Sequence, residues 1–289
     1  MINILKLDEI FQSWSMKRNI VESFPEYLDI LLNEYNFTMN SKTLFNLGML
    51  DPLTHMELME DTFLQLNEAG LPSIIEDALE SCGQLLKVEK VNFLILPLNP
   101  QKEFVISEMY GSVAYTIKDN FFLLTTPIKD KGRWASQIKS LCFHEYCHIY
   151  RNTKIKKSNQ SRTLIERVIE EGLAESYVQY GLGEEYLGPW AKKQSKTTLL
   201  RYLPRMRTHL SEKKTKNIYA FMNGDIYNDL PHWIGYVLGY ELIQYLLETQ
   251  NANLLDLMAL DSVEVFNKID WKKFEIHLLK ESHSGNEVL

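Results

Sequence analysis

The sequence predicts an α+β fold that is mostly helical, with one small sheet next to a helix that carries two histidines. Apolar residues recur at helical spacing through most of the chain, including the stretch Ser136–Arg151. Between residues 88 and 128 the composition shifts to β-branched and aromatic residues, with turn signals at Asn99-Pro100 and Asp119-Asn120. We therefore expect the sheet to be formed by residues 88–128.

The first 87 residues are predicted to form a helical region. Helical spacing is clear in Ile20–Tyr35, in Glu57–Leu66 and in a helix that begins near Leu71 and continues through Leu86. Prolines at positions 25, 52 and 72 separate these segments. No residue in this region is a candidate for a catalytic, binding or metal site.

Composition narrows the class of protein. The 289 residues are 45% hydrophobic and 24% charged, which is typical of a soluble globular enzyme. A net charge of −7 argues against nucleic acid as a partner. Three cysteines give no paired framework, which favours a reducing, cytoplasmic setting. No apolar run is long enough to span a membrane and no signal peptide is recognisable, so we expect no membrane partner; the oligomeric state stays open.

The central motif is His144-Glu145-Tyr146-Cys147-His148, of the form H-E-x-x-H. On a helix, residues four apart are one turn on and about 40° round the axis, so both imidazoles can reach one metal ion. Glu145 lies about 60° from His148, close enough to hold a water beside that ion. These are the groups that a zinc hydrolase needs. The alternative is an ordinary amphipathic helix with two surface histidines.

The following helix, Arg162–Val178, offers a third metal ligand. Its apolar stripe contains two carboxylates, Glu171 and Glu175, which are costly in a core-facing position unless a cation compensates them. Gly172 would let this helix approach a neighbour closely. Glu166 and Glu170 lie off the stripe and are expected on a solvated acidic face.

Together, His144-Glu145-x-x-His148 and Glu171-Gly172-Leu173-Ala174-Glu175 resemble the gluzincin metallopeptidases. More narrowly, the chain is similar over about its C-terminal half to a bacterial family of predicted zinc-dependent proteases. The resemblance implies a zincin-like catalytic domain at residues 88–289, with metal-site helices in 136–180 and C-terminal helices in 190–280. It also implies one zinc per chain held by His144, His148 and Glu171, with Glu145 as general base and Glu175 orienting a ligand histidine.

The resemblance also suggests where substrate binds. In gluzincins an edge strand pairs with the substrate backbone, and Gly111–Ile117 is the corresponding stretch, which makes Gly111, Ser112, Val113 and Ala114 candidate substrate-binding residues. A closed structural sheet is the alternative. The chain shows no clear counterpart of the Gly-x-Met-Glu-Asn motif of aminopeptidases, so an endopeptidase is favoured.

The stretch Pro231–Tyr240 offers donors for the oxyanion of a tetrahedral intermediate. His232 and Tyr236 are four residues apart, and we prefer Tyr236 because it lies on the helix itself. Gly235 and Gly239 form a small-x-x-x-small ridge suited to close helix packing. Upstream, Trp190–Asn217 is strongly basic and could steer an anionic partner, although a solvated helix face is the favoured interpretation.

The sequence therefore predicts a zinc-dependent peptidase that hydrolyses peptide bonds with a zinc-bound water activated by Glu145, acting on a peptide or protein. The alternative is an inactive, metallopeptidase-like protein that binds zinc and has a regulatory role. The complete H-E-x-x-H favours the enzyme, because a structural zinc site has no use for Glu145.

Overall fold

The chain divides into two compact units, Met1–Thr153 and Lys154–Leu289, in a computed structural model. The structure describes residues 2–6, 9, 10, 12, 13, 16, 23–37, 39–51, 54–155 and 162–284. The composition shift near residue 87 lies inside the first unit, because helices that precede it pack on strands that follow it.

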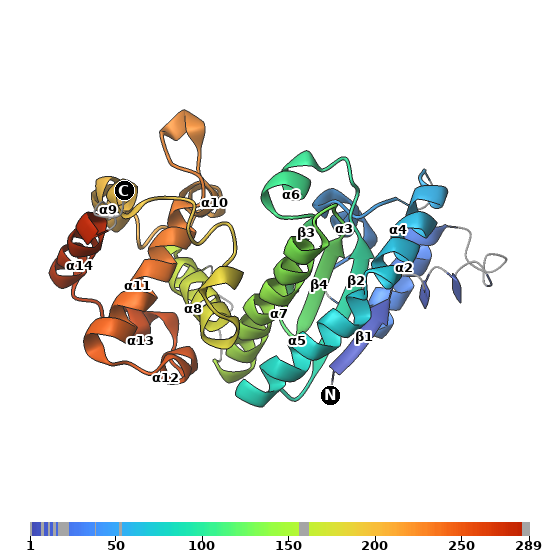
Figure 1. Ribbon diagram of the computed structural model, residues 1–289, viewed down its shortest axis with the longest axis horizontal. Coiled ribbons are helices and arrows are strands. Elements are labelled where there is room, and N and C mark those ends of the chain that lie inside the picture. Colours follow the sequence, from blue (N-terminus) through green and yellow to red (C-terminus); the bar gives the residue numbers. More distant parts are fainter. Residues whose placement is uncertain are drawn as a thin grey trace. The chain divides into compact units, whose positions relative to one another are not determined.

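The first unit is built on a four-stranded sheet in the order β1-β2-β4-β3 (Figure 1). β1 (Ile2–Lys6), β2 (Val91–Pro97) and β4 (Asn120–Thr125) are parallel, and β3 (Ser112–Ile117) runs antiparallel to β4 at the edge. The three later strands confirm the predicted sheet. A two-residue hairpin loop joins β3 to β4, with Lys118 at a positive φ of 59°.

The strand β1 corrects the prediction that residues 1–87 are helical. Ile2 and Ile4 alternate with Asn3, a period-two pattern that is too short to stand out beside the helical segments that follow. The strand forms because it pairs with β2, 89 residues away in the sequence (Ile2 with Val91). Pairing at that distance is a property of the folded chain and not of the local sequence.

Helices cover both faces of this sheet. On one face, Phe24, Leu28 and Leu32 of α2 (Phe24–Glu34) share a buried cluster with side chains of β2 and β4, such as Leu94 and Phe122. The expected helix began at Ile20, whose neighbourhood lies outside the described residues. The remaining helices of this unit are α3 (Ser41–Leu47), α4 (Met56–Glu68), α5 (Leu71–Leu85), α6 (Glu103–Glu108) and α7 (Lys131–Lys154).

The helix α7 carries the H-E-x-x-H motif and is anchored to the sheet by side-chain hydrogen bonds. It begins earlier than the sequence suggested, because Asp130 Oδ1 accepts from the backbone N–H of Arg133 at 3.0 Å and caps the first turn. The indole N–H of Trp134 donates to Thr125 of β4 at 2.9 Å. The Tyr146 hydroxyl donates to the carbonyl of Leu86, at the end of α5, at 3.0 Å. α7 is therefore held in place independently of any metal.

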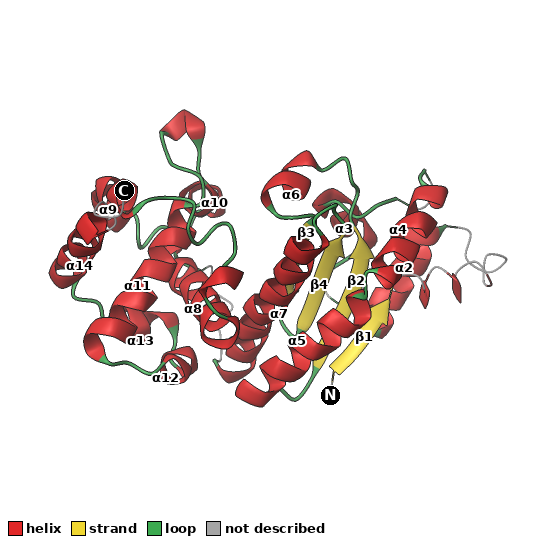
Figure 2. Cartoon of the chain, in the orientation of Figure 1, coloured by secondary structure: helices red, strands yellow, loops and turns green. Residues whose placement is uncertain are grey.

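In the second unit, the described elements are helices joined by loops (Figure 2). α8 (Leu164–Leu182) packs closely against α11 (Ile234–Gln250). Around this pair lie α9 (Lys196–Arg207), α10 (Thr215–Asn223), α12 (Leu254–Ala259), α13 (Ser262–Phe266) and α14 (Trp271–Ser284). No helix among the described residues is both long enough and apolar enough to cross a membrane.

Two glycines set the distance between α8 and α11. A Cβ on Gly172 would lie 2.1 Å from the carbonyl oxygen of Gly239, and a Cβ on Gly239 would lie 2.1 Å from the carbonyl oxygen of Val168. The two backbones are therefore in direct contact, as the predicted glycine ridge required. The other glycine of that ridge, Gly235, instead faces α10, with Met222 as its neighbour.

Candidate metal centre

The two motif histidines lie side by side on α7. Their Nε2 atoms are 3.2 Å apart, and their rings are nearly perpendicular, with centroids separated by 4.9 Å. Two nitrogens bound at 2.0–2.1 Å to a tetrahedral zinc would be about 3.3 Å apart. The spacing of His144 and His148 therefore fits a pair of ligands to one zinc.

Glu145 lies between these histidines in the sequence and is also buried. Its backbone carbonyl accepts a hydrogen bond from the Thr116 hydroxyl of β3 at 3.2 Å, which ties the motif to the edge strand. Burial raises the pKa of the Cys142 thiol, and the nearby negative charge of Glu145 raises it further. Cys142 and Cys147 are both buried, and neither forms a disulfide.

Glu171 lies on α8, whose start is fixed by a capping box between Thr163 and Glu166. One oxygen of the Glu171 carboxylate is 3.0 Å from Arg167 Nη2, one helical turn earlier. This partner was missed in the sequence, although the i, i+4 spacing of opposite charges was visible.

The prediction that Glu170 lies on a solvated face is wrong. Its side chain is buried and pairs with Arg162 Nη1 at 2.5 Å, and Arg167 lies 3.7 Å from the same oxygen. A buried carboxylate needs such a partner to offset the loss of hydration. Helical periodicity could not predict this burial, because it does not show whether a neighbouring segment covers a residue that lies off the apolar stripe.

His144, His148 and Glu171 each offer one ligand atom, and the three atoms lie within 4.8 Å of one another. Two imidazole nitrogens and one carboxylate oxygen are the protein ligands of many catalytic zinc sites. By geometry and by donor chemistry, these three residues can hold a zinc ion.

Glu175 is fully buried one turn after Glu171. Its carboxylate accepts the indole N–H of Trp190 at 2.7 Å and the backbone N–H of Gly188 at 3.0 Å. The acid is therefore held by the loop that follows α8, a contact that helical periodicity could not predict. Its predicted bond to a ligand histidine stays a prediction.

The two candidate oxyanion donors have different surroundings. Tyr236 lies in the first turn of α11, and its ring faces Trp190 with centroids 6.3 Å apart. Tyr236 thus contacts the same indole that donates to the Glu175 carboxylate. His232 precedes the helix; its ring packs on Trp233, and its carbonyl accepts from Gln194 at 2.8 Å. Trp233 takes a left-handed conformation with φ of 59°, which separates His232 from the helix.

The four candidate substrate-binding residues belong to the edge of the sheet. Gly111 has a positive φ of 76° and precedes β3, which contains Ser112, Val113 and Ala114. Among the described strands, β3 pairs with β4 alone, which leaves one side of it without a neighbouring strand. The expected edge position of this segment is confirmed, and its role in binding substrate stays a prediction.

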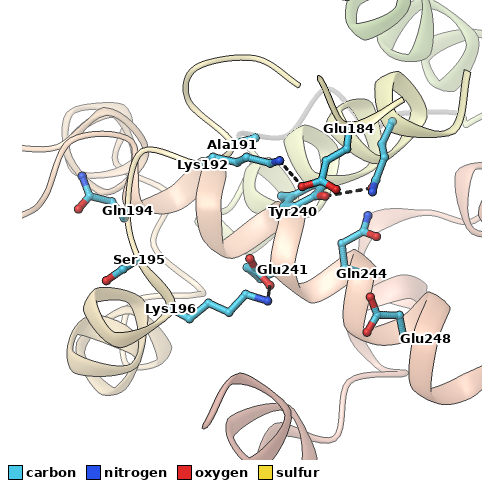
Figure 3. Close-up of a pocket in the computed structure, with 11 residues that line it drawn as sticks. Glu184, Ala191, Lys192, Gln194, Ser195, Lys196, Tyr240, Glu241, Gln244 and Glu248 are labelled. Carbon is cyan, nitrogen blue, oxygen red and sulfur yellow. Dashed lines mark hydrogen bonds and ion pairs between the residues drawn. The ribbon is translucent and has the colours of Figure 1, made fainter. Parts of the chain in front are cut away.

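A polar cavity of about 430 Å³ lies within the second unit (Figure 3). Tyr240 and Glu241 come from α11, and Lys196 opens α9. Lys196 Nζ is 3.4 Å from the Glu241 carboxylate, and the Tyr240 hydroxyl donates to Gln179 at 3.0 Å. Burial raises the pKa of Glu241, with the charge of Lys196 acting in the opposite direction. The cavity thus contains charged groups that partly neutralise each other.

Comparison with known proteins identifies a family for this chain. Residues 71–267 match the family described as "Predicted Zn-dependent protease (DUF2268)". Two similar proteins are both from Bacillus subtilis (strain 168). "Uncharacterized protein YjaZ" is 22% identical over 256 residues, which are 86% of this chain and 94% of YjaZ. "Uncharacterized protein YjfC" is 26% identical over 140 residues, about half of each chain (46% and 47%). No solved structure matches significantly.

Proposed function

Because the chain belongs to this family of predicted Zn-dependent proteases, we propose that it is a zinc endopeptidase of the gluzincin type. His144, His148 and Glu171 would hold one zinc, and Glu145 would act as general base. The observation that carries the proposal is the grouping of these three ligand atoms within 4.8 Å, with the motif glutamate next to one of the ligand histidines. When bound, zinc would polarise a peptide carbonyl and lower the pKa of water at the site.

The protein's own part in the chemistry is proton transfer and positioning. The carboxylate of Glu145 accepts a proton from the attacking water and then passes it to the nitrogen of the leaving amine. Its burial, and the bond from Thr116 to its backbone carbonyl, support a fixed position for this carboxylate. A fixed position matters because a general base must lie within hydrogen-bond reach of the proton it removes.

Two further groups would position the substrate. The free side of β3 offers backbone N–H and C=O groups to an extended peptide, which would add a strand at Ser112–Ala114. Tyr236 would donate its hydroxyl to the oxyanion. Its packing against Trp190 supports this choice over His232, which lies outside the helix.

The zinc assignment is tested by metal analysis of purified protein. Wild type is expected to contain one zinc per chain, and His148→Ala should lose most of it because two ligands hold the ion far less tightly than three. His55→Ala, which changes a half-buried histidine whose Nδ1 contacts the Thr54 hydroxyl, is the matched control and should keep full zinc content. Equal zinc in His148→Ala and wild type would refute the assignment.

The peptidase assignment is tested with a mixed peptide library and the variant Glu145→Gln. The amide keeps the shape of the carboxylate but is no useful base, so cleavage should be abolished while zinc stays bound. Glu103→Gln, at an exposed carboxylate on α6, should cleave as wild type does. A wild-type protein that binds zinc and cleaves nothing would instead favour the zinc-binding regulatory protein.

A further inference from the structure

The loop between α10 and α11 exposes two large hydrophobic side chains. Ile226 is 89% exposed and Tyr227 is 96% exposed, the highest values among the large hydrophobic residues that the structure describes. Figure 1 shows this loop projecting beyond the helices that flank it. Exposed apolar side chains at a projecting tip are typical of a surface that binds something.

The tip has a well-defined conformation. Asp225 and Leu230 exchange two backbone hydrogen bonds of 2.9 Å, which close the loop at its base. The Asp225 carboxylate accepts from the N–H groups of Tyr227 and Asn228, at 3.0 and 3.3 Å. Arg205 of α9 donates to the carbonyl of Asn228 at 2.7 Å. These bonds fix the backbone of the tip, so binding would cost little backbone ordering entropy.

The surroundings of the tip are basic, although the whole chain is acidic. From residue 196 to residue 232 there are seven lysines and arginines and three acidic residues, in a chain with a net charge of −7. Arg205 lies at the loop, and the charge of Lys216 contributes to lowering the pKa of Asp225, after the larger effect of a hydrogen bond from Asn228. The acidic side chains of the loop are engaged locally, since Asp229 accepts from the Tyr202 hydroxyl.

The shape and chemistry of this tip favour a lipid surface over a protein. A stable protein interface buries about 800 Å² on each partner, more than a projecting pair of side chains offers. A bilayer interface needs only a few apolar side chains, and tyrosine suits it because its ring enters the acyl boundary while its hydroxyl stays among the headgroups. Lysines and arginines next to the tip would then contact anionic headgroups.

We propose that the loop of residues 224–231 docks the protein on the surface of an anionic lipid bilayer, with Ile226 and Tyr227 entering the interface. Arg205 and Lys216 would lie against the headgroups. Such docking is peripheral and reversible. The prediction of no membrane partner was based on the absence of a spanning segment, which has no bearing on this kind of attachment. The proposal is independent of zinc and of peptidase activity.

The test is co-sedimentation of the full chain with phosphatidylcholine vesicles, with and without phosphatidylglycerol. Wild type should bind the anionic vesicles, and binding should weaken as salt is raised, because screening shortens the reach of the charges. The double variant Ile226→Ser/Tyr227→Ser should bind at least about tenfold more weakly. Val263→Ser/Leu279→Ser, a pair of partly exposed residues elsewhere in the second unit, is the matched control and should bind as wild type does.

A charge variant tests the second half of the proposal. Lys216→Glu should weaken binding to anionic vesicles and leave weak binding to neutral vesicles unchanged. The proposal is overturned if wild type does not bind anionic vesicles, or if the tip and control variants lose binding equally. It is also overturned if light scattering without lipid shows that wild type self-associates through the tip, with Ile226→Ser/Tyr227→Ser monomeric. The loop would then bind a second copy of the chain.

Discussion

Replacing Gly172 with alanine tests how closely the candidate metal centre depends on the packing of α8 on α11. The added Cβ would lie 2.1 Å from the carbonyl oxygen and 2.9 Å from the Cα of Gly239, whereas ordinary contacts begin at 3.4 Å. Both neighbours are backbone atoms of a helix, so no side-chain rotation can relieve the clash. The two helices must separate by roughly 1 Å at their crossing.

The magnitude follows from two opposing effects. Overpacking in a core costs about 1–3 kcal/mol, and a backbone-to-backbone clash belongs at the upper end of that range. Alanine returns about 1 kcal/mol through its higher helix propensity. We expect a net loss of about 2 kcal/mol in the free energy of unfolding, which lowers Tm by about 4–8 °C. Since Glu171 is the preceding residue, zinc affinity should fall as well.

Thermal unfolding followed by circular dichroism measures this effect, with zinc content measured in parallel. Gly83→Ala in α5 is the matched control, because its Cβ would lie 3.8 Å from the Tyr146 hydroxyl and meet nothing closer. That variant should gain about 0.5–1 kcal/mol. If Gly172→Ala unfolds at the same temperature as wild type, or higher, the proposed backbone contact between α8 and α11 is wrong.

Three other variants make sharp predictions. Glu175→Ala removes the acceptor of the Trp190 indole N–H, so the free energy of unfolding should fall by about 2–4 kcal/mol. Zinc affinity should fall about 10–100-fold in a competition titration. Unchanged zinc affinity would mean that Glu175 has a purely structural role. In Glu241 burial raises the pKa above its ordinary 4.5, so the folded state holds this proton more tightly than the unfolded chain does. Glu241→Gln should therefore be more stable than wild type near neutral pH in urea titrations, with the advantage vanishing as pH falls to 4.5. Tyr236→Phe should lower kcat about 10²–10³-fold with zinc retained; a larger loss in His232→Ala would reverse that choice.

Local patterns in the sequence determined the parts of the site that depend on neighbouring residues. His144 and His148 share one face of a helix because four residues make about one turn, so their 3.2 Å approach follows from the motif alone. Close packing at Gly172 and at Gly239 was predicted for the same reason, because each glycine lies where helical periodicity places it toward another helix. The strands β2, β3 and β4 were found through their β-branched and aromatic composition and the turns between them.

Contacts between distant residues decided the rest. The strand β1 exists because it pairs with β2, 89 residues later in the sequence. Glu170 is buried by the packing around α8, and Arg162 and Arg167 offset its charge there. The carboxylate of Glu175 is held by Trp190, fifteen residues away. The high exposure of Ile226 and Tyr227 is also a result of the fold, because no other segment that the structure describes packs over these two side chains. Periodicity reports which way a side chain points along its own element, and only tertiary packing determines what lies there.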